Sequence, residues 1–236
     1  MNILVTGGAG YIGSHIILGL NKTSYDYLTV DNFSSGHLVL DESNLIEVDI
    51  NNYINLRNSL KNIKIDAIIH LASKSIVSES IENPMSYLEN NIHSSLNIIK
   101  LAVEKKVQSI IFSSTAAVYG IPVDMVISEE HSTIPINPYG DSKLIVENIL
   151  KKSYDYYGIN SVIFRFFNAA GADPEARSGE CHEPETHLIP NILNSAKANS
   201  SGIEIYGNDY NTLDGTCVRD YICLLYTSDA ADEEDS

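Results

Sequence analysis

The chain has 236 residues, of which 44% are hydrophobic and 19% are charged. This composition is typical of a globular protein, and the length suffices for a sizeable core without a metal or a disulfide to hold it together. Fifteen basic residues against 31 acidic ones give a net charge of −16. That charge disfavours nucleic acids and anionic membranes as main partners.

The cysteines and the N-terminal segment point to a cellular compartment. Cys181, Cys217 and Cys223 form neither a CxxC pair nor an even-numbered framework, as expected of reduced thiols. The first residues lead directly into a strand, without the basic and apolar regions of a signal peptide. No apolar run approaches the roughly 18 residues that a membrane-spanning helix needs. We therefore expect a soluble, cytoplasmic protein.

In chain order, short runs rich in β-branched residues alternate with longer amphipathic segments through the first half of the chain. This alternation is typical of an α/β fold in which helices cover a doubly wound parallel sheet. Strands are expected at Asn2–Thr6, Tyr27–Asp31, Asn44–Val48, Ala67–His70, Ser109–Ser113 and Ser161–Arg165. Helices are expected at Tyr11–Asn21, Asn52–Lys61, Pro84–Lys105 and Tyr139–Tyr157.

After Asn168 the alternation weakens into loops rich in Gly, Pro and Asp, with one further helix expected at Leu188–Ala198. We expect three regions: a first domain over residues 1–168, a partial, smaller lobe over 169–222, and an anomalous tail over 223–236. Thr227–Ser236 holds five acids, no base and no apolar residue larger than Ala. Two interpretations of the tail stay open, a frayed acidic terminus and a segment foreign to the gene.

The first strand runs into a loop with glycines at Gly7, Gly8, Gly10 and Gly13, and a helix follows. Such glycines permit a tight turn and a close approach of the backbone to a pyrophosphate at the helix N-terminus. Asp31 ends the second strand, where a carboxylate can accept hydrogen bonds from ribose hydroxyls and repel a 2′-phosphate. Asp31 as a simple turn residue is the alternative. Loop and acid together predict a dinucleotide site that prefers NAD.

Two further strand ends lie at the same expected edge of the sheet. Asp49 and Ile50 follow the third strand, where a carboxylate and an apolar side chain can bracket an adenine. Alone, Asp49 would more often be a strand-end residue. Leu71 and Ala72 follow the fourth strand, and we interpret His70 beside them as a structural histidine.

Tyr139 and Lys143 are four residues apart on an expected helix and therefore share one face. An ammonium about 4–6 Å away can lower the pKa of a phenol towards neutrality, where the phenol can act as a general base. The preceding strand leads into Thr115, whose hydroxyl can hydrogen-bond a substrate alcohol and the phenol. Thr115 as a mere strand-end residue is the alternative.

Several motifs together resemble the extended short-chain dehydrogenase/reductase family. They are TGGAGYIGSH at the start, FSSTAAVYG from Phe112, PYGDSKLIVE from Pro138 and FRFFNAAGA from Phe164. Two further motifs, ETHLIP from Glu185 and GNDYNTLDGTCVRDYI from Gly207, are similar to the branch of that family that epimerises UDP-hexoses at C4. The resemblance runs over residues 1–222. It implies a Rossmann-type sheet with a smaller C-terminal substrate lobe.

Carried over by position, the resemblance implies Tyr139 as base, Lys143 as its electrostatic partner and ribose ligand, and Thr115 as hydroxyl helper. It implies NAD contacts at Gly7, Gly10, Tyr11, Ile12, Gly13, Asp31, Asn32, Ser34, Ser35, Asp49, Ile50, Leu71, Ala72, Asn90, Lys143 and Phe167. It implies contacts of the UDP-hexose with Thr115, Tyr139, Asn168, His187, Leu188, Tyr206 and Arg219. For Arg219 the alternative is a surface arginine paired with Asp220, although a guanidinium suits a diphosphate well.

The implied reaction interconverts UDP-glucose and UDP-galactose by oxidation at C4, rotation of the 4-keto sugar and re-reduction, with NAD regenerated each cycle. A dehydratase of the same family would need an Asp-Glu pair directly after the helper hydroxyl, and this chain has Ala116 and Ala117 there. Members of the family are longer than this chain, so an NAD-binding fragment without turnover stays open. The resemblance also allows a homodimer.

Overall fold

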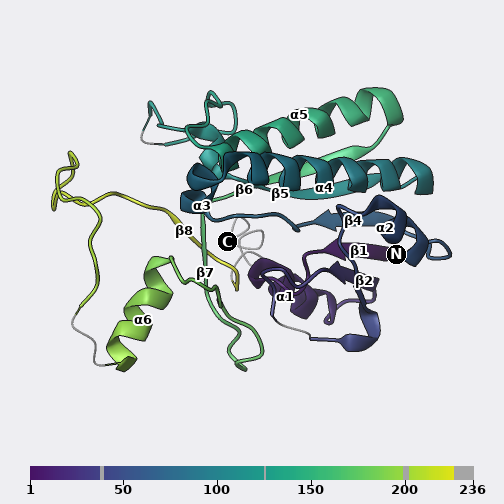
Figure 1. The fold of residues 1–236 in the computed structure, drawn as a ribbon, viewed down its shortest axis with the longest axis horizontal. Coiled ribbons are helices and arrows are strands. Elements are labelled where there is room, and N and C mark those ends of the chain that lie inside the picture. Colours follow the sequence, from purple (N-terminus) through teal and green to yellow (C-terminus); the bar gives the residue numbers. More distant parts are fainter. Residues whose placement is uncertain (38–39, 125, 199–201, 226–236) are drawn as a thin grey trace, which may run out of the picture. The chain divides into compact units, whose positions relative to one another are not determined.

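The computed structural model describes residues 1–37, 40–124, 126–198 and 202–225, and divides into two compact units between Phe166 and Phe167. Figure 1 shows the elements of each unit. No helix in the described part of the chain is long and apolar enough to cross a membrane. The cysteines, all of them described, are free thiols.

The first unit is built on a six-stranded sheet in the order β3-β2-β1-β4-β5-β6. All neighbouring strands are parallel, and Thr6 at the end of β1 pairs with Val30 on β2 and with His70 on β4. The strands are β1 (Asn2–Thr6), β2 (Asp26–Asp31), β3 (Leu45–Glu47), β4 (Ala67–His70), β5 (Ser109–Thr115) and β6 (Asn160–Phe166). This arrangement confirms the predicted doubly wound sheet. Its strand order reverses between β1 and β4, where open sheets of this kind bind ligands.

Five α-helices accompany the sheet: α1 (Tyr11–Leu20), α2 (Tyr53–Ser59), α3 (Val77–Glu82), α4 (Pro84–Lys105) and α5 (Pro138–Tyr157). Short 3₁₀ turns lie at η1 (Glu42–Asn44) and η2 (Ala116–Tyr119). The start of α5 follows directly from its sequence. The side chain of Asn137 accepts a hydrogen bond of 2.8 Å from the backbone N–H of Gly140, and Pro138 occupies the first turn. The helix ends at Tyr157, and the capping residue Gly158 has a φ of +69°, which suits a residue without Cβ.

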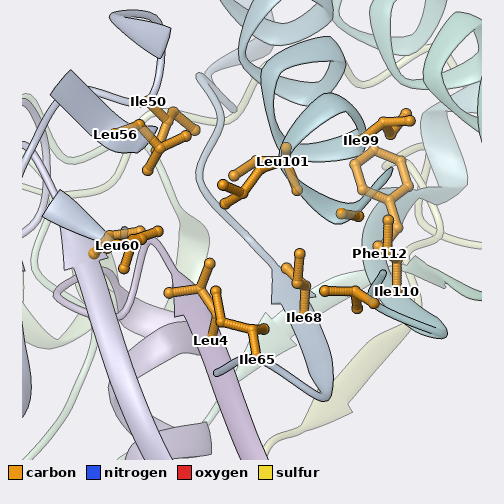
Figure 2. Packing of buried hydrophobic residues seen from close by; sticks show 14 of the residues in the cluster. Leu4, Ile50, Leu56, Leu60, Ile65, Ile68, Ile99, Leu101, Ile110 and Phe112 are labelled. Carbon is orange, nitrogen blue, oxygen red and sulfur yellow. The ribbon is translucent and has the colours of Figure 1, made fainter. Parts of the chain in front are cut away.

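The two faces of the sheet carry separate cores because successive side chains on a strand point to opposite sides. Leu4 and Ile68 belong to the larger core with buried side chains of α2, α4 and α5. Figure 2 shows Ile110 and Phe112 of β5 in the same cluster, near Leu101 and Ile99 of α4. On the other face, the residues in between on β1 and β4 pack against α1. Side chains are thus buried on both faces of the sheet, and the ends of its strands carry the candidate site.

The second unit contains β7 (Asn168–Ala170), α6 (Leu188–Ala198) and β8 (Tyr221–Cys223). The two short strands pair in parallel, with Asn168 opposite Tyr221 and Ala170 opposite Cys223. The boundary expected between residues 222 and 223 therefore falls inside a strand. Residues 226–236, which hold most of the expected tail, lie outside the described residues.

Candidate active site

The loop between β1 and α1 requires glycine at two of its positions. Gly7 has a φ of +75°, and a Cβ there would lie 2.7 Å from the backbone nitrogen of Ala72. A Cβ on Gly13 would collide with the carbonyl oxygen of Gly7. Gly10 precedes α1, and the first turn of that helix holds no acidic side chain. A close turn at an uncapped helix N-terminus fits the diphosphate of a dinucleotide.

Asp31 links the end of β2 to this loop. Its carboxylate accepts a hydrogen bond of 3.0 Å from the backbone N–H of Ala9 and another of 2.9 Å from that of Phe33. The side chain is buried. Asp31 therefore does stabilise a turn, as the simpler interpretation held, and its carboxylate also lies against the glycine-rich loop. Each carboxylate oxygen has a second lone pair for a ligand hydroxyl.

A hollow of about 460 Å³ opens beside the ends of β2 and β3. Two residues that the sequence assigned to the cofactor, Asn32 and Asp49, line it. Its other lining residues are Glu47, Val48, Asn55, Asn58 and Ser59, which sequence reasoning missed because most of them lie on α2 rather than in a motif. Ser34 and Ser35 are exposed just beyond β2. Ile50 is buried, and its side chain belongs to the larger core.

Five further residues expected to contact the cofactor within this unit are half-buried. They are Tyr11 and Ile12 in the first turn of α1, Leu71 and Ala72 directly after β4, and Asn90 on α4. The side-chain oxygen of Asn90 accepts a hydrogen bond of 3.0 Å from Asn51. Since β1 and β4 are neighbours and parallel, the ends of both strands lie at one edge of the sheet.

His70 is a structural residue, as expected. Its Nδ1 lies 2.7 Å from the hydroxyl of Thr6 and its Nε2 lies 2.9 Å from the hydroxyl of Ser95. Burial, together with the nearby charge of Lys143, lowers the pKa of His70 to about 3. The imidazole is therefore neutral and serves to tie β4 to β1 and α4.

Tyr139, Lys143 and Thr115 meet where β5 ends and α5 begins. Lys143 is buried, and its Nζ donates hydrogen bonds of 2.8 Å to the hydroxyl of Ser73 and 2.7 Å to the carbonyl of Ser113. That Nζ lies 5.8 Å from the centre of the Tyr139 ring. The side chain of Thr115 acts on the Tyr139 phenol and lowers its pKa. The structure thus brings together the three residues that the sequence selected.

The protonation states differ from the expectation. Burial raises the pKa of Tyr139 to about 12, against a smaller lowering by the Thr115 hydroxyl. Burial also lowers the pKa of Lys143 to about 7, so this amine is only partly charged at neutral pH. The prediction that Lys143 brings the phenol towards neutrality is therefore wrong for the ligand-free protein. Desolvation by burial is the largest cause of both shifts.

Buried polar groups hold this cluster in place. Glu147, one turn beyond Lys143 on α5, is fully buried and forms an ion pair of 2.7 Å with Arg165 on β6. It also accepts a hydrogen bond of 2.5 Å from Ser114, the residue before Thr115. The sequence contained one usable signal for this role, because Glu147 continues the four-residue spacing of Tyr139 and Lys143.

Besides Thr115 and Tyr139, the residues expected to bind the nucleotide sugar lie in the second unit, and all five are exposed: Asn168, His187, Leu188, Tyr206 and Arg219. Phe167, which was expected to contact the cofactor, is half-buried. The side-chain amide of Asn168 donates a hydrogen bond of 2.7 Å to the carbonyl of Asp220. Hydrogen bonding to Glu180 raises the pKa of His187, and Glu185 adds a smaller effect in the same direction. Arg219 bonds the carbonyl of Val218, and within the described residues it forms no ion pair with Asp220.

Known proteins resemble this chain over nearly its whole length. It is 44% identical to a UDP-glucose 4-epimerase of Halalkalibacterium halodurans over 98% of this chain and 69% of that protein. A UDP-glucose 4-epimerase of Brucella ovis, solved in complex with NAD, superposes with a TM-score of 0.88 at 38% identity, over 99% of this chain and 74% of that one. The enzyme of the same name from Bifidobacterium longum, solved with NAD⁺ and UDP, gives a TM-score of 0.91 at 34% identity, over 98% and 73%.

The family assignment agrees with the geometry of the glycine-rich loop and of the Tyr139 cluster. Residues 3–232 match the NAD dependent epimerase/dehydratase family. That match covers the cofactor loop, the end of β5 and the start of α5. The chain therefore belongs to the NAD dependent epimerase/dehydratase family, whose enzymes use NAD as their cofactor.

Proposed function

We propose that this chain inverts C4 of a UDP-hexose and so interconverts UDP-glucose and UDP-galactose. The cluster of Tyr139, Lys143 and Thr115 carries the proposal. It stands at the end of β5, on the same edge of the parallel sheet as the glycine-rich loop after β1. A proton-transfer group is thereby built into the edge that binds the cofactor. The names of the similar proteins support this choice of substrate.

The residues of the first unit fit NAD. The loop around Gly7 and Gly13 would hold the diphosphate, and Asp31 would accept hydrogen bonds from the adenosine ribose. Asn32 and Asp49 would face the adenosine in the hollow that they line. Lys143 would donate to the second ribose. When bound, NAD supplies the group that takes a hydride from C4 and returns it.

The chain itself moves the proton. Tyr139 takes the proton of the 4-hydroxyl through its phenolic oxygen, and Thr115 holds the hydroxyl and the phenol in line. Loss of hydride and proton leaves a 4-keto sugar, which turns within the site and receives the hydride on its other face. Tyr139 then returns the proton. Because the pKa of Tyr139 is raised to about 12 in the ligand-free protein, the phenol needs added positive charge nearby before it can act as a base.

The exposed residues of the second unit would bind the nucleotide sugar. Arg219 suits the diphosphate, because a guanidinium donates two parallel hydrogen bonds, and the one hydrogen bond of its side chain within the described residues goes to the carbonyl of Val218. Asn168, Leu188 and Tyr206 would contact the rest of the nucleotide sugar. His187 would donate a hydrogen bond to it.

Two other functions are less well supported. A dehydratase must protonate a leaving hydroxyl and deprotonate C5, and the positions after Thr115 are Ala116 and Ala117, which have no group for either task. A fragment that binds NAD without turnover would keep the cofactor site of the first unit intact but would not convert UDP-galactose. A homodimer stays a prediction.

The test uses Tyr139→Phe, which removes the phenolic proton and keeps the ring. Turnover of UDP-galactose should fall by about 10²–10⁴-fold while NAD binding persists. Tyr154→Phe is the matched control, since Tyr154 is an exposed tyrosine on the same helix and should tolerate the change. Wild-type turnover in Tyr139→Phe would refute the assignment. NAD binding by the unaltered chain without turnover would favour the non-catalytic interpretation.

A further inference from the structure

Four side chains of one short segment in the second unit converge on a common point. They belong to Glu180, His182, Glu185 and His187, which we call the acid–histidine cluster. Each offers one ligand atom, and these four atoms all lie within 4.8 Å of one another. All four residues fall within eight positions of the chain, so the local backbone alone brings them together.

The contacts within the cluster are crowded around one nitrogen. The Nδ1 of His187 lies 2.8 Å from an oxygen of Glu180 and 2.8 Å from an oxygen of Glu185. A single N–H cannot donate well to two carboxylates at once. The Nδ1 of His182 is buried without a hydrogen bond, 3.5 Å from the same Glu180 oxygen. Two carboxylates and one unsatisfied nitrogen therefore face a position where a cation would relieve all of them.

We propose that the acid–histidine cluster binds one divalent transition-metal ion of the Zn²⁺ type. Two imidazole nitrogens and two carboxylate oxygens match the ligand preference of Zn²⁺, whereas Mg²⁺ and Ca²⁺ prefer sites made of oxygen alone. The charges balance, because two carboxylates offset the two charges of the ion. The carboxylates are 11% and 14% exposed, so solvent screens this attraction only partly.

The geometry requires only a modest adjustment. Zn–N and Zn–O bonds of about 2.0–2.1 Å in a tetrahedron place the donor atoms about 3.3 Å apart. The widest separation in the cluster is 4.8 Å, so a closure of about 1.5 Å is enough. The rings of His182 and His187 have their centres 4.8 Å apart, so both imidazoles lie beside the same position.

A metal-free interpretation competes with this one. The carboxylate of Glu185 also accepts a hydrogen bond of 2.8 Å from the backbone N–H of His187, just before α6. The cluster could thus be an ion-paired cap of that helix. This interpretation gives no role to the unbonded Nδ1 of His182, and it predicts that the segment has no affinity for a metal.

The experiment is a calorimetric titration of the full chain, freed of metal by a chelator, with ZnCl₂ and separately with MgCl₂. We expect one Zn²⁺ site per chain and no comparable Mg²⁺ site. His182→Ala should weaken Zn²⁺ binding at least about tenfold. Loss of a residue that merely hydrogen-bonds a metal ligand already costs about that much in metal affinity. Glu180→Gln keeps the size of the side chain, removes one ligand charge and should have a similar effect.

Two matched variants exclude other sources of binding. Cys181→Ser removes the exposed thiol beside His182, and His93→Ala removes an exposed histidine of α4. Both should keep the Zn²⁺ affinity of the unaltered chain. Circular dichroism of every variant separates loss of the site from loss of the fold.

Absence of a saturable Zn²⁺ site would overturn the proposal. So would unchanged affinity in folded His182→Ala and Glu180→Gln, or binding that disappears with Cys181→Ser. The readout is metal affinity and does not depend on turnover, so failure here leaves the proposed epimerase function untouched.

Discussion

Gly7 gives the sharpest test of how the loop binds its cofactor. Gly7→Ala adds a single methyl group to a residue whose φ is +75°. An L residue in this left-handed region costs about 1–2 kcal/mol. The added Cβ would also lie 2.7 Å from the nitrogen and 2.8 Å from the Cα of Ala72, which are backbone atoms that cannot rotate away. Overpacking of this kind costs about 1–3 kcal/mol more.

The expected loss of unfolding free energy for Gly7→Ala is therefore about 2–5 kcal/mol, a large part of the roughly 5–15 kcal/mol that a domain possesses. NAD affinity should fall as well, because the backbone that approaches the diphosphate must shift. Urea denaturation measures the first effect, and titration with NAD under native conditions measures the second.

Gly19→Ala is the matched control. Gly19 is an exposed residue of α1 with an ordinary φ, and a Cβ there would have no neighbour within 4 Å. Because alanine favours a helix over glycine, the control should gain up to about 1 kcal/mol and keep its NAD affinity. If Gly7→Ala proved as stable as Gly19→Ala and bound NAD equally well, the close approach of the loop to the end of β4 would contribute neither to stability nor to NAD binding.

Three further predictions follow from named side chains. In calorimetric titrations, Asp31→Ala should weaken the binding of NAD and reduce the difference between the affinities for NAD and NADP. Equal affinities of the unaltered chain for the two cofactors would refute the role of the carboxylate. Burial lowers the pKa of Lys143 to about 7, so the unfolded chain binds more protons between about pH 7 and about pH 10 and stability should rise with pH there. Lys143→Met should flatten that rise in urea denaturation, and an unchanged slope would show that Lys143 is not desolvated. Deleting residues 227–236 should leave the thermal midpoint unchanged, because five carboxylates and no large apolar side chain offer little to bury; a marked fall would show that the segment belongs to the fold.

The sequence predicts the first unit well because its elements are long or strongly patterned. The bounds of β1, β4, α4 and α6 agree with the prediction, and the other predicted elements differ by one or two residues at their ends. The six residues of α3 are too few to show a helical period, so that helix was missed. Strands β7 and β8 have three residues each, which is too few to show an apolar alternation.

Some residues of the candidate site could be predicted from the sequence and others could not. Tyr139, Lys143 and Thr115 could be found from spacing, because a four-residue interval on a helix fixes which side chains share a face. Ser73 could not, since its contact with Lys143 joins residues 70 positions apart and follows no spacing rule. The burial of the Ile50 side chain in the larger core could not be read from the sequence either, because a residue just beyond a strand can face the core or the edge of the sheet.

The protonation of the Tyr139 cluster shows most clearly what spacing leaves out. Two groups four residues apart on a helix indicate attraction, and attraction alone would lower the pKa of the phenol. In the folded chain both groups are desolvated, which raises the pKa of Tyr139 to about 12 and lowers that of Lys143 to about 7. Each shift moves its group towards the uncharged form, so the ligand-free cluster holds a neutral phenol beside a partly neutral amine. A cation bound at the same edge of the sheet would reverse the balance for Tyr139, because it stabilises the phenolate without restoring water. The base strength of Tyr139 would then depend on whether the positively charged nicotinamide ring of NAD lies beside it.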